Sequence, residues 1–149
     1  MRTKILVDSN ILFSAILNSE SRIGQLILNG QSHYAFYAPK YSQTELLKHK
    51  DKIMKLANLS DNEFNEVYHF ILKGVILLDH SLLTDRTVSN AYKYCKDIDI
   101  DDTIFVAFSQ YLKCKLWTGD KKLIQGDAKG YKNTITTEAL YEDFIKKGL

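Results

Sequence analysis

Short apolar runs alternate along this chain with longer segments in which apolar side chains recur every three or four positions. A short apolar run bounded by polar residues is typical of a buried strand, and the wider spacing is typical of an amphipathic helix. The predicted strands are residues 4–8, 34–38, 75–78, 115–118 and 134–136. The predicted helices are residues 10–18, 21–30, 41–57, 60–73, 84–95, 101–112 and 137–147.

The alternation of strands and helices indicates the fold class. It implies crossover connections between parallel strands, with helices covering both faces of the sheet. We therefore predict an α/β fold, a three-layer α/β/α sandwich around a central parallel sheet of about four or five strands. At 149 residues and without an internal repeat, the chain fits a single domain spanning residues 1–149.

Local patterns add detail to three helices. Ser60 and Glu63 have the spacing of a capping box, which predicts a helix start there. Segment 103–112 is apolar nearly all round, which predicts a buried helix. Helices 10–18 and 21–30 carry more apolar side chains than one sheet face should bury. They therefore form either an exposed patch that suits a homodimer or an antitoxin helix, or part of an ordinary core, and the sequence leaves both interpretations open. The patch would consist of Phe13, Ile16, Leu17, Ile23, Leu26 and Ile27.

Acidic side chains stand where predicted strands end or where the following helices begin. Asp8 closes the first strand, and Asp120 comes shortly after the fourth. Glu45 lies near the start of the helix after the second strand, and Asp102 ends the acidic run 97–102. The carboxyl ends of parallel strands meet at one edge of the sheet, where ligands bind in open α/β folds. We therefore expect these four carboxylates to share one pocket.

Each acid also has a structural interpretation that the sequence leaves open. Asp8 and Asp120 have the positions of helix N-caps, and Glu45 follows Ser42 at the spacing of a capping box. The alternating aspartates of residues 97–102 also invite comparison with an EF-hand calcium loop. That comparison fails because the turn-making glycine and the final bidentate glutamate of such a loop are both missing.

Four carboxylates in one pocket would repel one another, so the site would either raise their pKa values or bind cations. Oxygen ligands favour Mg²⁺ or Mn²⁺, and the absence of His and Cys from these motifs argues against zinc. Such a metal site suits phosphoryl chemistry, because the metal polarises the phosphate and lowers the pKa of a water.

The charge balance points to a polyanionic partner. The chain has 20 basic and 18 acidic side chains and a net charge of +2. If four acids share a pocket, the rest of the surface is more strongly basic. Lysines cluster within residues 48–55, 113–122 and 129–132. Each cluster alone is also typical of a solvated lysine-rich surface, whereas the clusters acting together would form a basic rim around the acids. Phosphate backbones are the natural partner of such a rim.

Other features of the sequence argue against a membrane protein, a secreted protein and a protein built on disulfides or zinc. No segment has the roughly 20 apolar residues needed to cross a bilayer, and the first residues lack the pattern of a signal peptide. We therefore expect no membrane partner and a cytoplasmic location. Cys95 and Cys114 are too few for a disulfide framework or a zinc set, so we expect two small buried apolar side chains.

Taken together, four segments resemble the PIN-domain nucleases, including the VapC-type toxins of bacterial and archaeal toxin–antitoxin pairs. They cover nearly the whole chain in the order of the family. The matching segments are residues 6–12, 42–46, 102–108 and 116–123.

The resemblance implies a metal-dependent endoribonuclease that hydrolyses RNA phosphodiester bonds with Mg²⁺ or Mn²⁺. It implies RNA as substrate and a small antitoxin protein as partner of a toxin, whereas a homodimer is suggested only by the apolar patch described above. The implied catalytic and metal-binding residues are Asp8, Glu45, Asp102 and Asp120, with Asp99 as an additional acid. The implied supporting residues are Ser9, Asn10 and Thr118, and Lys121 and Lys122 are candidates for substrate binding.

Within the acidic run, the spacing of the resemblance assigns Asp102 to the metal, Asp101 to the helix cap and Asp97 to solvent. Two other functions stay open at this point. One is a non-catalytic RNA-binding or regulatory scaffold on the same fold. The other is a phosphoaspartate enzyme or receiver domain, for which Asp79, after the third predicted strand, would be the phosphoacceptor.

Overall fold

The predicted strands pair in parallel to form one sheet. This computed structural model describes residues 1–96, 100–125, 131 and 133–148. Within them, five strands lie in the order β3-β2-β1-β4-β5, and every neighbouring pair is parallel. The strands are β1 (Thr3–Val7), β2 (Tyr34–Pro39), β3 (Val75–Leu78), β4 (Lys115–Trp117) and β5 (Thr134–Ile135).

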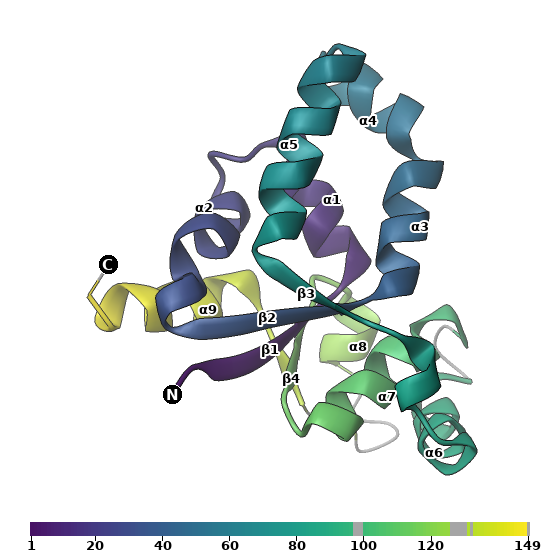
Figure 1. The fold of residues 1–149 in the computed structure, drawn as a ribbon. Coiled ribbons are helices and arrows are strands. Elements are labelled where there is room, and N and C mark those ends of the chain that lie inside the picture. The colour runs from purple at the N-terminus through teal and green to yellow at the C-terminus, as the bar shows by residue number, and fades with distance from the viewer. Residues whose placement is uncertain (97–99, 126–130, 132, 149) are drawn as a thin grey trace.

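Helices cover both faces of this sheet, which confirms the predicted three-layer sandwich (Figure 1). One face is covered by α1 (Ser9–Leu17), α2 (Arg22–Asn29), α5 (Asp61–Lys73) and α9 (Thr137–Lys146), and α4 (Lys50–Ala57) packs against α1 and α5 farther from the sheet. The other is covered by α6 (Asp85–Cys95), α7 (Thr103–Leu112) and α8 (Lys121–Ile124). α3 (Lys40–Lys48) follows β2 directly. The 3₁₀ segments are Gly30–Ser32, His80–Leu82 and Ile100–Asp102.

The two cores meet across the central strands. In β1, Ile5 and Val7 belong to the core under α1, α2 and α5, whereas Leu6 belongs to the core under α6 and α7. Trp117 and Leu116 of β4 divide in the same way. Because successive strand residues point to opposite faces, these apolar runs are buried on both sides. The sheet is therefore fixed between two layers, and its carboxyl edge is positioned firmly.

The single predicted helix 41–57 is wrong in one respect, because the chain turns within it. α3 ends and α4 begins around His49, whose backbone (φ −99°, ψ 14°) is not helical. The turn brings Ile53 fully into the core while Leu47 stays exposed. Apolar spacing alone does not reveal such a turn, since both segments keep helical periodicity.

The predicted apolar patch on the early helices is also wrong. Ile16, Leu26 and Ile27 are at most 2% exposed. The other members of that set, Phe13, Leu17 and Ile23, pack against the same core. They are covered because α5 and α9 join α1 and α2 in one layer, so more than a sheet face is available to bury them.

Other local predictions are confirmed. Ser60 and Glu63 form a complete capping box at the start of α5. The middle of α7, from Phe105 to Ser109, is buried. Cys95 and Cys114 are both buried free cysteines.

None of the helices in the described part of the chain has the length and apolar character required to span a bilayer.

Candidate active site

The carboxyl ends of the two central strands bring distant parts of the sequence together. β1 and β4 are neighbours in the sheet, and the amide of Asp8 donates to the carbonyl oxygen of Trp117 at 3.0 Å. The residues that follow each strand, Asp8 and Thr118, therefore lie side by side. Their contact sets the centre of the candidate site.

Thr118 connects the two aspartates that follow these strands. Its hydroxyl Oγ1 donates to Oδ2 of Asp8 at 2.7 Å and accepts from the amide of Asp120 at 3.0 Å. Thr118 is fully buried, and Asp8 is only 4% exposed. The Asp8 carboxylate is thus held in place by a side chain 110 positions away in the sequence.

Burial raises the pKa of Asp8 above its ordinary value, because the ionised form loses water. The Thr118 hydroxyl opposes this shift, as do the backbone amides of Asn10 and Ser9, whereas the negative charge of Asp120 adds to it. Asp8 is the N-cap residue of α1, but its side chain makes no standard capping hydrogen bond there, so capping alone does not account for this buried carboxylate. The site therefore contains a negative charge that a nearby cation would stabilise.

Asp120 is a helix N-cap, as its structural interpretation predicted, but this is only part of its role. Its Oδ1 atom accepts from the amides of Lys122 and Leu123 at 2.8 and 3.3 Å, so it caps the short helix α8. These bonds orient the carboxylate, and its charge acts on Asp8. Capping and a place beside Asp8 are thus compatible for this residue.

Glu45 is linked to the same edge through Ser9. The hydroxyl of Ser9 lies 2.8 Å from Oε1 of Glu45 and 2.8 Å from Oγ of Ser42. The capping-box interpretation of Glu45 is wrong, because α3 begins at Lys40 with Pro39 at its N-cap. Ser42 and Glu45 instead lie one turn apart on a helix face that points to the end of β1.

Sequence reasoning missed the contribution of Ser42 to this site. It considered this residue only as a helix cap, but Ser42 is fully buried and bonded to Ser9. The signal was the three-residue spacing to Glu45, which puts both side chains on one face of a helix.

Asp102 occupies the N-cap of α7, where the prediction had placed Asp101, and its side chain makes no capping bond. Because α7 leads back to the start of β4, its N-terminus lies toward the carboxyl edge of the sheet. Asp102 is half-buried, with Oδ2 shielded from solvent, whereas Asp101 is exposed. Asp97 and Asp99 lie outside the described residues.

A cavity of about 430 Å³ adjoins this edge between α3, α6 and α7, and Tyr41, Asp101 and Ile104 contribute to its wall. The charges of Glu45 and, less strongly, Asp101 raise the pKa of the Tyr41 phenol above its ordinary value. Tyr41 therefore lies within electrostatic reach of acids from two separate segments.

The expected metal fits the chemistry of these side chains, with one restriction. Among the described residues, no three His, Cys, Asp or Glu side chains lie close enough together to hold a metal ion. Asp8 and Asp120 are the pair whose charges interact. Mg²⁺ keeps several water ligands and is usually bound by one or two carboxylates together with substrate phosphates. Asp8 and Asp120 offer two carboxylates of this kind.

The predicted basic rim is correct only in part. Lys121 and Lys122 are exposed on α8, beside Asp120. Lys113 and Lys115 lie at the start of β4, which is the opposite edge of the sheet. The lysines of residues 113–122 are therefore divided between two edges, because a strand separates them. Lys129 and Lys132 are outside the described residues.

Comparison with known protein families agrees with this geometry. The family described as the PIN domain matches residues 6–140, a range that includes Asp8, Glu45, Asp102 and Asp120. The chain therefore belongs to the PIN domain family, and the predicted resemblance is confirmed. A search of curated proteins found no match. The fold is thus that of a family whose members are generally divalent-metal-dependent nucleases.

The order of the strands argues against the receiver-domain interpretation. β3 is at the outer edge of the sheet, so Asp79 does not follow a central strand. Its Oδ1 accepts from the amide of Ser81 at 2.9 Å, and its Oδ2 lies 3.5 Å from Nζ of Lys40. Asp79 is therefore the cap of a 3₁₀ turn with a surface ion pair.

Proposed function

We propose that this protein is an endoribonuclease that hydrolyses RNA phosphodiester bonds with Mg²⁺ or Mn²⁺. The observation that carries the proposal is the buried Asp8 carboxylate at the end of β1, held by Thr118 and next to the charge of Asp120. Membership of the PIN domain family supports nuclease chemistry at this edge. Asp8, Glu45, Asp102 and Asp120 are the proposed catalytic and metal-binding acids.

In this proposal the side chains of the protein orient the carboxylates and supply the negative charge that binds the cation. Thr118 fixes the Asp8 carboxylate, and Ser9 fixes Glu45. Burial of Asp8 gives its charge a strong effect on a bound cation, because the surroundings are poorly solvated. The metal, when bound, would polarise the phosphate and lower the pKa of the attacking water. Lys121 and Lys122 are exposed beside Asp120, where they would contact the RNA backbone.

The test is the Asp8→Asn variant. Asn keeps the shape of the side chain and can still accept the Thr118 hydrogen bond, but removes one negative charge. We expect cleavage of single-stranded RNA in Mg²⁺ or Mn²⁺ to fall by roughly a hundredfold or more, and wild-type cleavage to stop in EDTA. Glu142→Gln, an exposed acid on α9, is the matched control and should cleave normally.

Two results would contradict the proposal. Equal cleavage by Asp8→Asn, or full activity of the wild type in EDTA, would remove the metal site from the mechanism. RNA binding without cleavage in any divalent metal would instead support the non-catalytic scaffold on the same fold.

We further propose that the protein is the toxin of a type II toxin–antitoxin pair. The support is the VapC-like order of the segments that carry Asp8, Glu45, Asp102 and Asp120. Its partners would be a small antitoxin protein and a second copy of the chain. Leu56 and Phe70, on α4 and α5, are 61% and 68% exposed and offer apolar surface for such contacts.

Expression in a bacterial host tests the toxin proposal. Induction of the wild type should arrest growth, and Asp8→Asn should not. Co-expression with the product of the adjacent reading frame should restore growth, and light scattering should show a complex or a dimer. Normal growth, together with a monomeric mass and active RNA cleavage in vitro, would leave the nuclease in place and reject the toxin.

A further inference from the structure

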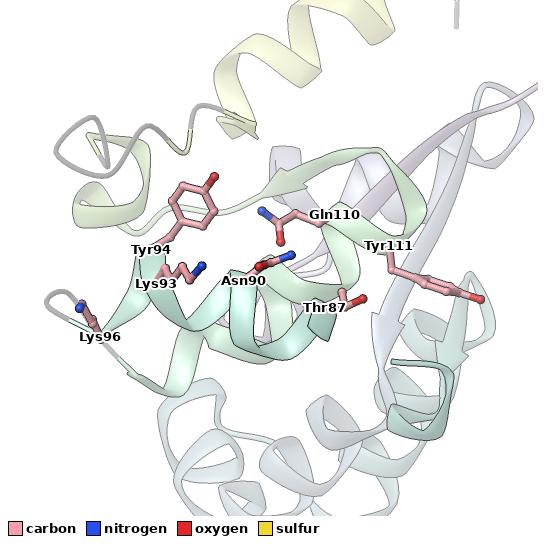
Figure 2. Close-up of a pocket in the computed structure, with 7 residues that line it drawn as sticks. All are labelled: Thr87, Asn90, Lys93, Tyr94, Lys96, Gln110 and Tyr111. Carbon is pink, nitrogen blue, oxygen red and sulfur yellow. The ribbon is translucent and has the colours of Figure 1, made fainter. Parts of the chain in front are cut away.

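A cavity of about 820 Å³ lies along the packed helices α6 and α7 (Figure 2). Its wall comes from both helices. Asn90, Lys93 and Tyr94 of α6 contribute to it, as do Gln110 and Tyr111 of α7. Lys96, directly after α6, completes one end. None of these residues belongs to the proposed set of catalytic acids, Asp8, Glu45, Asp102 and Asp120, which we call the acid site.

The chemistry of this wall differs from that of the acid site. Its described residues include two lysines and no carboxylate. Asn90, Lys93 and Tyr94 are spaced so that they share one face of α6. Figure 2 shows the side chains of Asn90 and Gln110 near each other, with Lys93 next to them on α6. The cavity thus combines cations, amides that both donate and accept, and aromatic rings.

The position of the cavity relates it to the acids. Lys96 ends the turn after α6, and the 3₁₀ segment Ile100–Asp102 contacts α6. α6, which carries much of the cavity wall, is therefore in contact with the segment that carries Asp102. Tyr111 lies near the other end of α7, a helix that spans about 15 Å at 1.5 Å per residue. A single strand of nucleic acid that extends from the acid site could therefore lie along about 15 Å of this surface.

We propose that this cavity binds unpaired nucleotides of a single-stranded RNA next to the bond that is cut, an inference that rests on the proposed function. Lys93 and Lys96 contact phosphates. Asn90 and Gln110 bond to base edges, and Tyr94 and Tyr111 offer rings on which bases stack. Duplex RNA binds more weakly, because its bases are already stacked and paired.

A second basic cavity, of about 830 Å³, provides the comparison. It lies at the amino edge of the sheet, with Lys4, Lys113, Lys115 and Lys147 in its wall. Asp143 is in the same wall, and its Oδ2 is 3.0 Å from Nζ of Lys147. This cavity remains strongly basic, but it lies at the edge of the sheet opposite the acids, so position rather than charge separates the two cavities. It is the less suitable place for RNA and a source of matched control variants.

The first experiment measures RNA binding without cleavage. A short fluorescein-labelled single-stranded RNA is titrated by anisotropy in EDTA with the wild type, Lys93→Ala/Lys96→Ala and Lys4→Ala/Lys115→Ala. All four lysines are exposed, and melting curves check the fold. We expect the first pair to weaken binding about tenfold and to reduce the salt slope of log K by about 1.4, for two phosphate contacts in single strands. The control pair should change binding less than about twofold.

The second experiment tests stacking with two tyrosines of nearly equal exposure. Tyr111 is 45% exposed in the cavity wall, and Tyr92 is 43% exposed on α6 outside it. Tyr111→Ala should weaken binding of single-stranded RNA between about fivefold and a hundredfold. Tyr92→Ala should bind as the wild type does.

Equal losses in the two lysine pairs, unchanged binding in the first pair, or no RNA binding by the wild type would each overturn the inference. These outcomes are separate from failure of the nuclease proposal, because binding is measured without metal. Loss of binding in the first pair, combined with no cleavage by the wild type in any metal, would support the RNA site and reject the nuclease.

Discussion

Asp8 carries its carboxylate into a space almost closed to solvent, with the Thr118 hydroxyl as hydrogen-bond donor and Asp120 as a second negative charge. A charge in that position opposes folding, because it loses hydration and faces a like charge. Active sites commonly keep such groups at a cost in stability. The raised pKa of Asp8 therefore has a consequence that stability measurements can detect.

We predict that Asp8→Asn is more stable than the wild type at pH 7 in metal-free buffer. The folded-state pKa of Asp8 is raised, so the ionised form is disfavoured by folding at any pH above it. As pH falls through that pKa, the wild type becomes neutral at this position and the difference shrinks. Thermal melts should show a rise of about 2–4 °C at pH 7, equivalent to about 1 kcal/mol, and little at acid pH.

The Glu142→Gln variant is the control, since this exposed acid should give the same melting temperature as the wild type at every pH. A variant Asp8→Asn that melts below the wild type at pH 7 would show that its ionised carboxylate stabilises the fold without metal. That result would contradict the assignment of an uncompensated charge.

The neighbouring aspartates of the run before α7 differ in burial, and this difference predicts their importance. Asp102 is half-buried and Asp101 is exposed. We expect Asp102→Asn to reduce RNA cleavage severely and Asp101→Asn to reduce it mildly, with Asp99→Asn intermediate and Asp97→Asn close to neutral. Both Asp102→Asn and Asp101→Asn should melt like the wild type, because the Asp102 side chain makes no capping bond that Asn would lose and Asp101 is exposed. An inactive Asp101→Asn with an active Asp102→Asn would shift the assignment by one residue.

From the sequence, a residue could be assigned to the candidate site only where it directly follows a predicted strand. Asp8 and Asp120 follow apolar runs, so their place at the carboxyl edge could be predicted. The bonds that position the carboxylates could not be, because Thr118 and Ser9 reach partners in other segments. Which of their atoms meet depends on strand register and helix rotation, neither of which is contained in a local pattern.

At the scale of elements, prediction worked best where periodicity and a capping signal agreed. α5 has both, and its capping box forms as predicted. The segment 41–57 has periodicity without an internal stop signal, so the break at His49 was missed. The four-residue helix α8 was missed because it is too short to show a period.

We predict that Ser60→Ala destabilises the protein by about 1 kcal/mol, because the amide of Glu63 loses its hydrogen-bond acceptor. Chemical denaturation should report this change, with Asn62→Ala, exposed in the same turn, as the control. RNA cleavage at a temperature well below the melt should stay unchanged, since α5 contributes none of the proposed catalytic acids. A loss of cleavage in Ser60→Ala without a change in stability would contradict this separation.

At the scale of the whole molecule, the two cores share the same strands. Ile5 and Leu6 are neighbours in β1 but belong to opposite layers, as do Trp117 and Leu116 in β4. Neither layer can lose its packing without exposing a strand that the other layer also covers. The layered architecture followed from the alternation of elements in the sequence, whereas the strand order depends on crossovers that sequence patterns do not specify.

We therefore predict that residues 1–149 unfold as one cooperative unit, as a single domain should. Trp117 is the single tryptophan of the chain and is fully buried against Phe36, so its fluorescence reports the core under α1 and α5. Far-ultraviolet circular dichroism reports the helices of both layers. The two signals should give coincident guanidinium transitions, and separate midpoints would instead indicate two folding units.

The outer strands of the sheet have a consequence for how the protein behaves at high concentration. β3 is four residues long and β5 is two residues long. An exposed strand edge can pair with the edge of another molecule and start aggregation, and short edge strands are one way in which natural sheets reduce that hazard. The longer apolar strands β1 and β2 are in the interior, where both edges are already paired. The arrangement that gathers acids at the ends of central strands thus also withholds the most aggregation-prone segments from neighbouring molecules.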